Sequence, residues 1–146
     1  MIEPTNPGNI RYYSGCIGNN KGFCIFPSFE AGIFQIYKQL RLYYFRDNLK
    51  TITAIIGRYA PPSENNTTGY INFLSKFSGL PANQILKESD LIKLIPGILK
   101  MESGTNLSLE QIQTIISNAN PVINFSGSNL AILLPFILFA AVWMRK

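Results

Sequence analysis

The sequence lacks histidine altogether, and only eight of its 146 residues are Asp or Glu. Without histidine, the Ser-His-Asp and Cys-His nucleophile mechanisms are excluded, and so are zinc hydrolases with histidine ligands. The sequence also contains no phosphate-binding glycine loop and no G-x-S-x-G motif. These absences leave reactions that run on carboxylates alone, of which glycoside cleavage is the clearest example.

Cysteine is scarce as well, and its two residues, Cys16 and Cys24, flank the turn-like segment 18–20. They either form a disulfide across a hairpin or remain free and buried, and the sequence leaves both alternatives open. Two thiols without any histidine argue against a zinc site. We therefore expect no metal and no cofactor.

Charged residues make up only 14% of the chain, and the balance is basic, with 13 Lys and Arg against 8 Asp and Glu. A net charge of +5 suits an anionic partner such as cell wall, acidic lipid or nucleic acid, and charge alone does not choose among them. The same excess also serves to keep an apolar protein in solution. Length and the 47% apolar content predict one folded domain with at most a short appendage.

Most of the chain has the apolar periodicity of helices, at three- and four-residue spacing. The predicted helices cover residues 29–47, 51–59, 67 to a stop at Gly79, 91–101, and a last segment opened by a capping box at Ser108. Ser28 is the predicted N-cap of the first helix and Thr67 that of the third. Strand signals are confined to residues 10–26, where Tyr12, Tyr13 and then residues 23–26 predict a short hairpin turning at Asn19-Asn20. The fold class expected from these patterns is mainly α with a small β-element.

The C-terminal end has a different composition, because residues 130–144 carry no charge. As a helix this run is about 22 Å long, short of the roughly 30 Å hydrocarbon core of a bilayer, and extending it back to Val122 adds Asn and Ser residues. Trp143 and the final Arg145-Lys146 are typical of a membrane interface. A buried core helix of a soluble domain is the alternative.

We interpret this end as a single-pass C-terminal transmembrane anchor. The predicted organisation is a folded domain over residues 1–120, a linker over 121–129, and the anchor over 130–146. Residues 1–25 lack the apolar run of a signal peptide, so none is expected.

Several short boxes follow one another in the first 104 residues. Asn-Pro-Gly-Asn-Ile-Arg occupies residues 6–11, Ala-Pro-Pro-Ser-Glu-Asn occupies 60–65, and Glu-Ser-Gly occupies 102–104. Glycine, aromatic and isoleucine positions within 22–33 and 51–56 complete the pattern. This set resembles a phage family of small, lysozyme-like virion proteins that degrade peptidoglycan.

The resemblance implies a lysozyme-like helical domain with an N-terminal β-hairpin. It implies cleavage of the glycan strand, of the lytic transglycosylase or the muramidase or glucosaminidase type, to help genome entry through the host cell wall. The implied partners are peptidoglycan glycan strands, a lipid membrane and other virion proteins, with no nucleic acid. The implied location is the virion, anchored in the viral inner membrane or the host membrane.

Glu102 is the first candidate for a catalytic residue. It follows Ile98 by four residues, which places it on the apolar side of its helix in the last turn before Gly104. Burial and the negative end of the helix both favour a protonated carboxyl, which is what a general acid requires. The motif also resembles the catalytic glutamate motif of lytic transglycosylases and bacterial glucosaminidases. The alternative is a helix-end Glu that simply reaches solvent.

Glu64 is the second catalytic candidate, as a carboxylate that positions water or stabilises an oxocarbenium-like charge. Its alternative role is structural, as an ion-pair partner of Arg11 or Arg58. For substrate binding, the amides and the guanidinium of the first box suit the acetamido and lactyl groups of the glycan, and tyrosines suit stacking on sugars. These predicted binding residues are Asn6, Asn9, Arg11, Tyr12 and Tyr70, although Tyr70 on a helix also fits a core position.

The chain departs from the family pattern at two positions. Tyr12-Tyr13 stands where a tryptophan is expected, and Met101 stands where a histidine is expected before the glutamate. These departures leave an alternative function from another class. In it, the protein is a non-catalytic, membrane-anchored virion component that binds peptidoglycan or coat protein.

Overall fold

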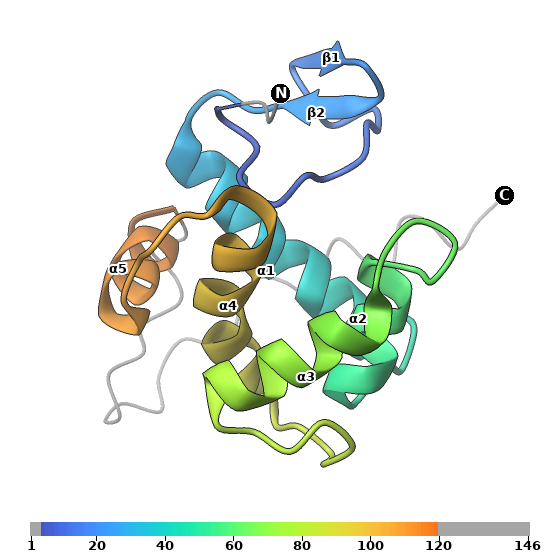
Figure 1. Ribbon diagram of the computed structural model, residues 1–146. Helices are drawn as coiled ribbons and strands as arrows, with labels where there is room; N and C mark the ends of the chain where they lie inside the picture. The colour runs from blue at the N-terminus through green and yellow to red at the C-terminus, as the bar shows by residue number, and fades with distance from the viewer. Residues whose placement is uncertain (1–3, 120–146) are drawn as a thin grey trace, which may run out of the picture.

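The computed structural model describes residues 4–119, in which five α-helices surround one core and a small hairpin lies at one end (Figure 1). The hairpin strands are β1 (Gly18–Asn20) and β2 (Phe23–Ile25). The helices are α1 (Phe29–Phe45), α2 (Ile52–Tyr59), α3 (Thr67–Ser78), the 3₁₀ turn η1 (Glu88–Asp90), α4 (Leu91–Ser103) and α5 (Leu109–Ala119). The predicted mainly helical class with a small N-terminal β-element is confirmed.

Helix α4 is the centre of the core and packs against α1, α3 and α5. Its residues from Leu91 to Leu99 are buried apart from Lys93. Pro96 lies inside the helix, and Gly97 follows it where α3 comes closest. A Cβ at Gly97 would lie 2.5 Å from Leu74 Cδ1, so a larger residue would require the Leu74 side chain to shift.

The helix starts follow local capping chemistry. Ser28 Oγ accepts a hydrogen bond from the Ala31 amide at 3.1 Å, and Ser108 and Gln111 form the predicted capping box. The cap predicted for α3 at Thr67 is wrong, because Asn66 Oδ1 accepts from the Gly69 amide instead. Thr67 Oγ1 donates to the Ala60 carbonyl at 2.5 Å, which ties the start of α3 to the end of α2.

The hairpin turns at Lys21-Gly22 rather than at Asn19-Asn20. The strands pair antiparallel with Asn20 opposite Phe23, and Lys21 and Gly22 both have positive φ, of 50° and 89°. Two positive φ values match the right-handed twist of a two-residue hairpin, and glycine adopts the second without strain. The predicted contribution of Tyr12 and Tyr13 to a strand is wrong. Both lie outside the strands, although Arg11 forms an isolated bridge to Phe23 and the Tyr12 amide donates to the Gly22 carbonyl at 2.8 Å.

A disulfide between Cys16 and Cys24 closes the hairpin against the segment that precedes it, with 5.4 Å between the two Cα atoms. This settles the alternative that the sequence left open. We call residues 5–26 the N-terminal lobe and helices α1 to α5 the helical body.

The linker predicted over 121–129 and the anchor predicted over 130–146 lie outside the residues that the structure describes. Within residues 4–119, no helix is both long enough and apolar enough to cross a bilayer.

Candidate functional site

The last turn of α4 fixes the position of Glu102. The helix ends at Ser103, whose hydroxyl donates to the Leu99 carbonyl at 3.0 Å. Gly104 then takes a left-handed conformation, with φ of 72°. The glycine stop therefore operates as predicted, and Glu102 lies half-buried at the end of the central core helix.

Asn9 contacts Glu102 from the other end of the described chain. Its Nδ2 donates to Glu102 Oε2 at 2.9 Å and lies 3.3 Å from the Glu102 carbonyl oxygen. The Asn9 backbone has a φ of 49°, a conformation that asparagine tolerates better than most residues. The loop of the first box thus brings one side-chain amide to the candidate acid.

Gly8 lets this loop lie close against the helical body. A Cβ there would be 2.6 Å from Ile36 Cγ1 and 2.8 Å from the Tyr59 hydroxyl oxygen. The Tyr59 hydroxyl donates to the Gly8 carbonyl at 2.5 Å. Any larger residue at position 8 would lift the loop and move Asn9 away from Glu102.

Two tyrosines lie beside the Glu102 carboxylate. Burial, followed by the negative charge of Glu102, raises the pKa of Tyr59 and that of Tyr70. The Tyr70 hydroxyl is buried and has no hydrogen-bond partner within 3.5 Å among the described residues, although it is near enough for this charge to act on it. Both phenols therefore stay neutral donors next to the candidate acid.

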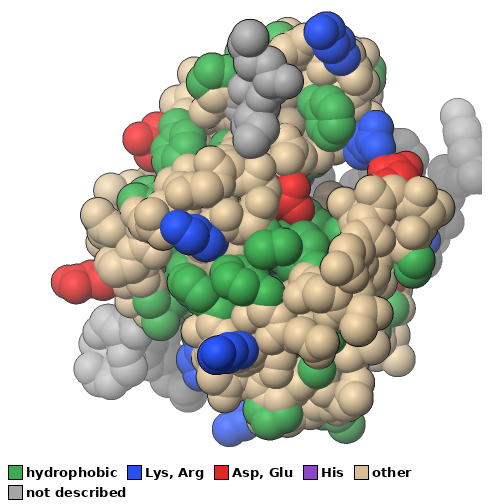
Figure 2. Space-filling view, in the orientation of Figure 1, with side chains coloured by type: hydrophobic (Ala, Val, Ile, Leu, Met, Phe, Trp, Pro, Cys, Tyr) green, Lys and Arg blue, Asp and Glu red, His purple; other side chains and the backbone are tan. Residues whose placement is uncertain are grey.

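The cleft above Glu102 has a volume of about 370 Å³. The N-terminal lobe provides one wall through Arg11, Lys21 and Phe23, and the α2–α3 loop provides the other through Glu64 and Asn65. Figure 2 shows a hollow on this face, with acidic atoms recessed in it and apolar side chains gathered beside them. The geometry brings together Asn9, Arg11, Glu64 and Glu102 of the predicted site.

Arg11 and Glu64 join the two walls. Arg11 Nη2 lies 2.5 Å from Glu64 Oε2, and the guanidinium also lies 4.9 Å from the centroid of the Phe23 ring. The two side chains remain 63% and 54% exposed, so this pair contributes little to folding stability. Of the structural partners considered for Glu64, Arg11 is the one that it contacts in the structure.

The other predicted binding residues lie differently. Asn6 is 1% exposed, and its amide is fully used, since it donates to the carbonyls of Ile10 and Cys24 and accepts from the Ile10 amide. Tyr70 is 4% exposed, so it has no open ring face for stacking. Direct sugar contact by these two stays a prediction that their burial disfavours. Tyr12 is exposed but lies outside the cleft.

Sequence reasoning missed the cleft-wall residues Lys21, Phe23 and Asn65. The hairpin itself was the signal for Lys21 and Phe23. A turn predicted at Lys21-Gly22, two residues after Asn19-Asn20, would have placed Lys21 at its tip. Tyr59 is half-buried and also lines the cleft, where its hydroxyl donates to the carbonyl of Gly8.

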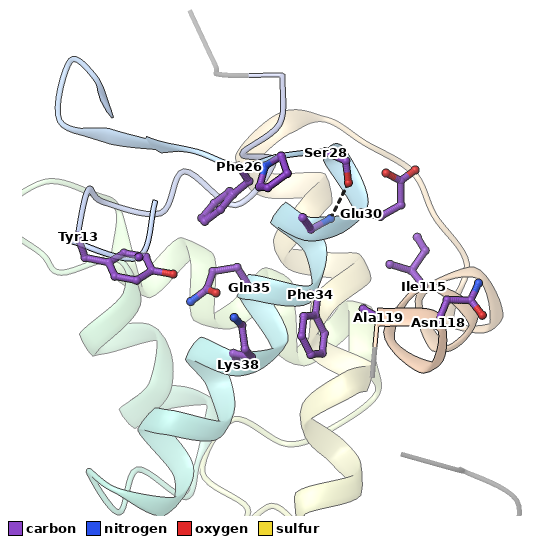
Figure 3. A pocket seen from close by; sticks show the side chains of 13 residues that line it. Tyr13, Phe26, Ser28, Glu30, Phe34, Gln35, Lys38, Ile115, Asn118 and Ala119 are labelled. Carbon is purple, nitrogen blue, oxygen red and sulfur yellow. Dashed lines mark hydrogen bonds between the residues drawn. The ribbon is translucent and has the colours of Figure 1, made fainter. Parts of the chain in front are cut away.

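Two further hollows lie on this part of the surface, and one of them adjoins the cleft. The first, which we call the side hollow, has a volume of about 570 Å³ and shares Asn9, Arg11, Tyr59 and Glu64 with the cleft. The second, of about 460 Å³, lies between α1 and the end of α5 and shares Tyr13 and Gln35 with the side hollow. In Figure 3 these two side chains and Lys38 lie on the same side of α1.

Comparison with known proteins gives one informative result. No family model matches the chain. Over 86 residues it is 40% identical to "Protein P5" of Pseudoalteromonas phage PM2. The match covers 55% of this chain and 54% of that protein, so the similarity extends over about half of each. The chain is therefore similar to a phage protein.

Proposed function

We propose that this protein is a phage virion component that cleaves the glycan strand of peptidoglycan, with Glu102 as the general acid. The observation that carries the proposal is the hydrogen bond from Asn9 to Glu102 at the floor of the cleft. A half-buried carboxyl that is held by an amide, flanked by two neutral phenols and free of any cation partner within residues 4–119 is suited to proton transfer.

The reaction proceeds from the Glu102 carboxyl. Its proton passes to the glycosidic oxygen as the bond from that oxygen to the anomeric carbon breaks, and the sugar ring oxygen shares the resulting positive charge. Glu102, now a carboxylate, then accepts a proton from the hydroxyl that attacks the anomeric carbon. Asn9 holds one carboxylate oxygen throughout, which fixes the orientation of the other.

The attacking hydroxyl is either water or a hydroxyl of the same sugar. Most glycoside hydrolases use a second carboxylate, as base or nucleophile, whereas ring closure within the sugar needs only one acid-base group. Glu64 is the other carboxylate of the cleft, and its oxygen is engaged by Arg11. This pairing favours the transglycosylase reaction, whose product carries an anhydro ring.

We extend the proposal to location. The relative encoded by a phage supports a virion component, and the apolar run at residues 130–146 supports attachment to the viral inner membrane or the host membrane. The membrane is then the surface from which the helical body reaches the cell wall.

The test is the pair of variants Glu102→Gln and Glu64→Gln, assayed on purified peptidoglycan with products identified by mass. Gln keeps the shape of Glu but has no proton to give, so Glu102→Gln should lower the rate by roughly 10²- to 10⁴-fold with the fold intact. Glu64→Gln should retain most of the activity and still yield anhydro products. A dead Glu64→Gln with an active Glu102→Gln would reverse the assignment. A wild-type chain that binds peptidoglycan without cleaving it would identify the non-catalytic alternative.

A further inference from the structure

The side hollow lies on the far side of the Arg11–Glu64 pair from the main cleft. The side hollow is larger than the cleft, at about 570 Å³ against about 370 Å³. Those of its lining residues that do not also line the cleft have no role in the proposed mechanism. A glycan strand bound in the cleft could therefore place a further group in the side hollow.

Arg58 gives the hollow its charge. It is exposed on α2, lines the hollow, and forms no ion pair within the part of the chain that the structure describes. The acid that shares the hollow, Glu64, is paired with Arg11, and Asp47, on which the charge of Arg58 also acts, is held by Arg46 through two hydrogen bonds of 2.6 and 2.9 Å. The guanidinium of Arg58 therefore has a charge that is available to a ligand.

The rest of the lining combines amide groups with small apolar surfaces. Gln35 and Gln39 present side-chain amides from α1, and Tyr12 and Leu42 add exposed apolar area, with exposed fractions of 49% and 39%. A guanidinium, two amides and apolar patches together match a short peptide that has carboxylates, peptide groups and methyl side chains. Tyr12 and Tyr13 also offer exposed rings on which a sugar could stack, but an uncharged sugar would leave the guanidinium of Arg58 without a partner.

We propose that the side hollow binds the carboxylate-bearing peptide branch of the glycan strand, with Arg58 as its carboxylate partner. This inference rests on the proposed function, because a strand brings its peptide branch to the hollow when its sugar occupies the adjoining cleft. The two spaces share the wall formed by Asn9, Tyr59 and the Arg11–Glu64 pair, so a branch on a cleft-bound sugar has a short path past that pair. The site would make the enzyme select strands that still carry their peptides.

The first test is binding, measured by calorimetric titration of the full chain with a synthetic stem peptide that has its carboxylates free. Amidation of the peptide carboxylates and the variant Arg58→Gln should each weaken binding by about tenfold, the effect of losing one charge-assisted hydrogen bond. Because both changes remove the same contact, combining them should add little further loss. The matched control is Lys76→Gln, which removes an exposed cation of α3 outside the hollow. Equal binding of the amidated peptide, or an equal loss in Lys76→Gln, would overturn the inference.

The second test compares cleavage of peptide-bearing strands with cleavage of strands stripped of peptides by an amidase. In Arg58→Gln the ratio of kcat/KM for the peptide-bearing strand to kcat/KM for the stripped strand should fall about tenfold. An unchanged ratio with active enzyme would refute the peptide site and leave the proposed function standing. If the protein binds the peptide through Arg58 but cleaves neither strand, the peptide site would stand and the proposed function would be refuted.

Discussion

The N-terminal lobe and the helical body hold their shapes by different means. The helical body contains most of the buried apolar residues, whereas the lobe contributes only Ile10, Cys24 and Phe26 to the core. The lobe is instead held by the disulfide and by side-chain hydrogen bonds to backbone, above all those of Asn6. Glu102 belongs to the helical body and Asn9 to the N-terminal lobe. The candidate site is therefore formed at a boundary between a packed structure and a cross-linked one, and each side should fail under a different perturbation.

The largest effect is expected from the core. Ile95 is fully buried on α4, so Ile95→Ala removes packing from the centre of the helical body and should cost about 2–5 kcal/mol of unfolding free energy. Chemical denaturation followed by far-UV circular dichroism measures this. If the loss stays below about 1 kcal/mol, α4 is not the centre of stability that its burial indicates.

A smaller effect is expected from the cross-link. The double variant Cys16→Ser/Cys24→Ser opens a short loop and should cost about 2–3 kcal/mol on the loop-entropy estimate. Hydrogen exchange should show reduced amide protection in residues 10–25 with the protection of α4 retained, and glycan cleavage should fall as Asn9 loses its position. Equal loss of protection in both regions would mean that the lobe and the body unfold as one unit and are not stabilised independently.

Asp90 tests whether the helical body also depends on charge. The hydrogen bond from Lys93 and then the one from the Lys87 amide lower the pKa of this carboxyl, so the folded state favours the charged form. Its contribution is complete above the ordinary Asp pKa of about 4 and is lost as pH falls through the lower folded value. Asp90→Asn should therefore cost about 1–2 kcal/mol at pH 7 and much less near pH 2, as measured by thermal unfolding at both pH values. The same cost at both would show that the charge is irrelevant.

The smallest effect on stability is expected where the two regions meet. Arg11→Ala breaks an exposed ion pair and should cost less than about 1 kcal/mol, while substrate binding weakens because the cleft wall loses its cation. Arg41→Ala is the matched control, since it removes an ion pair of comparable exposure with Glu88, away from the cleft. A variant that melts several degrees earlier yet turns over substrate normally per folded molecule would make Arg11 a structural pin.

Those parts of the fold that depend on neighbours in the sequence were predictable. Helix positions followed from apolar spacing, and the Ser28 cap, the Ser108 box and the Gly79 and Gly104 stops are signals within four residues. The cap of α3 was not predictable in this way. Thr67 is a suitable cap by type, but its hydroxyl is engaged by the Ala60 carbonyl, a contact that exists only once α2 and α3 have met.

The candidate site was predictable as a set of residues and not as an arrangement. The position of Glu102 in the last turn of α4 followed from helical spacing, but its contact with Asn9 joins positions 93 residues apart. Asn6 and Asn9 look equivalent in the sequence of the first box. The fold separates them, because three backbone groups inside the lobe use the whole amide of Asn6 and leave only Asn9 to face the cleft.

The left-handed backbone of Asn9 has a consequence for how this sequence can vary. Glycine would satisfy the backbone and lose the amide, whereas glutamine would keep an amide and strain the backbone. Aspartate would tolerate the backbone but set a second negative charge against Glu102. Conformation and chemistry therefore narrow the position to asparagine, while many of its neighbours are constrained by only one of the two. In distant homologues that keep the proposed reaction, we therefore expect asparagine at this position together with the helix-ending Glu-x-Gly.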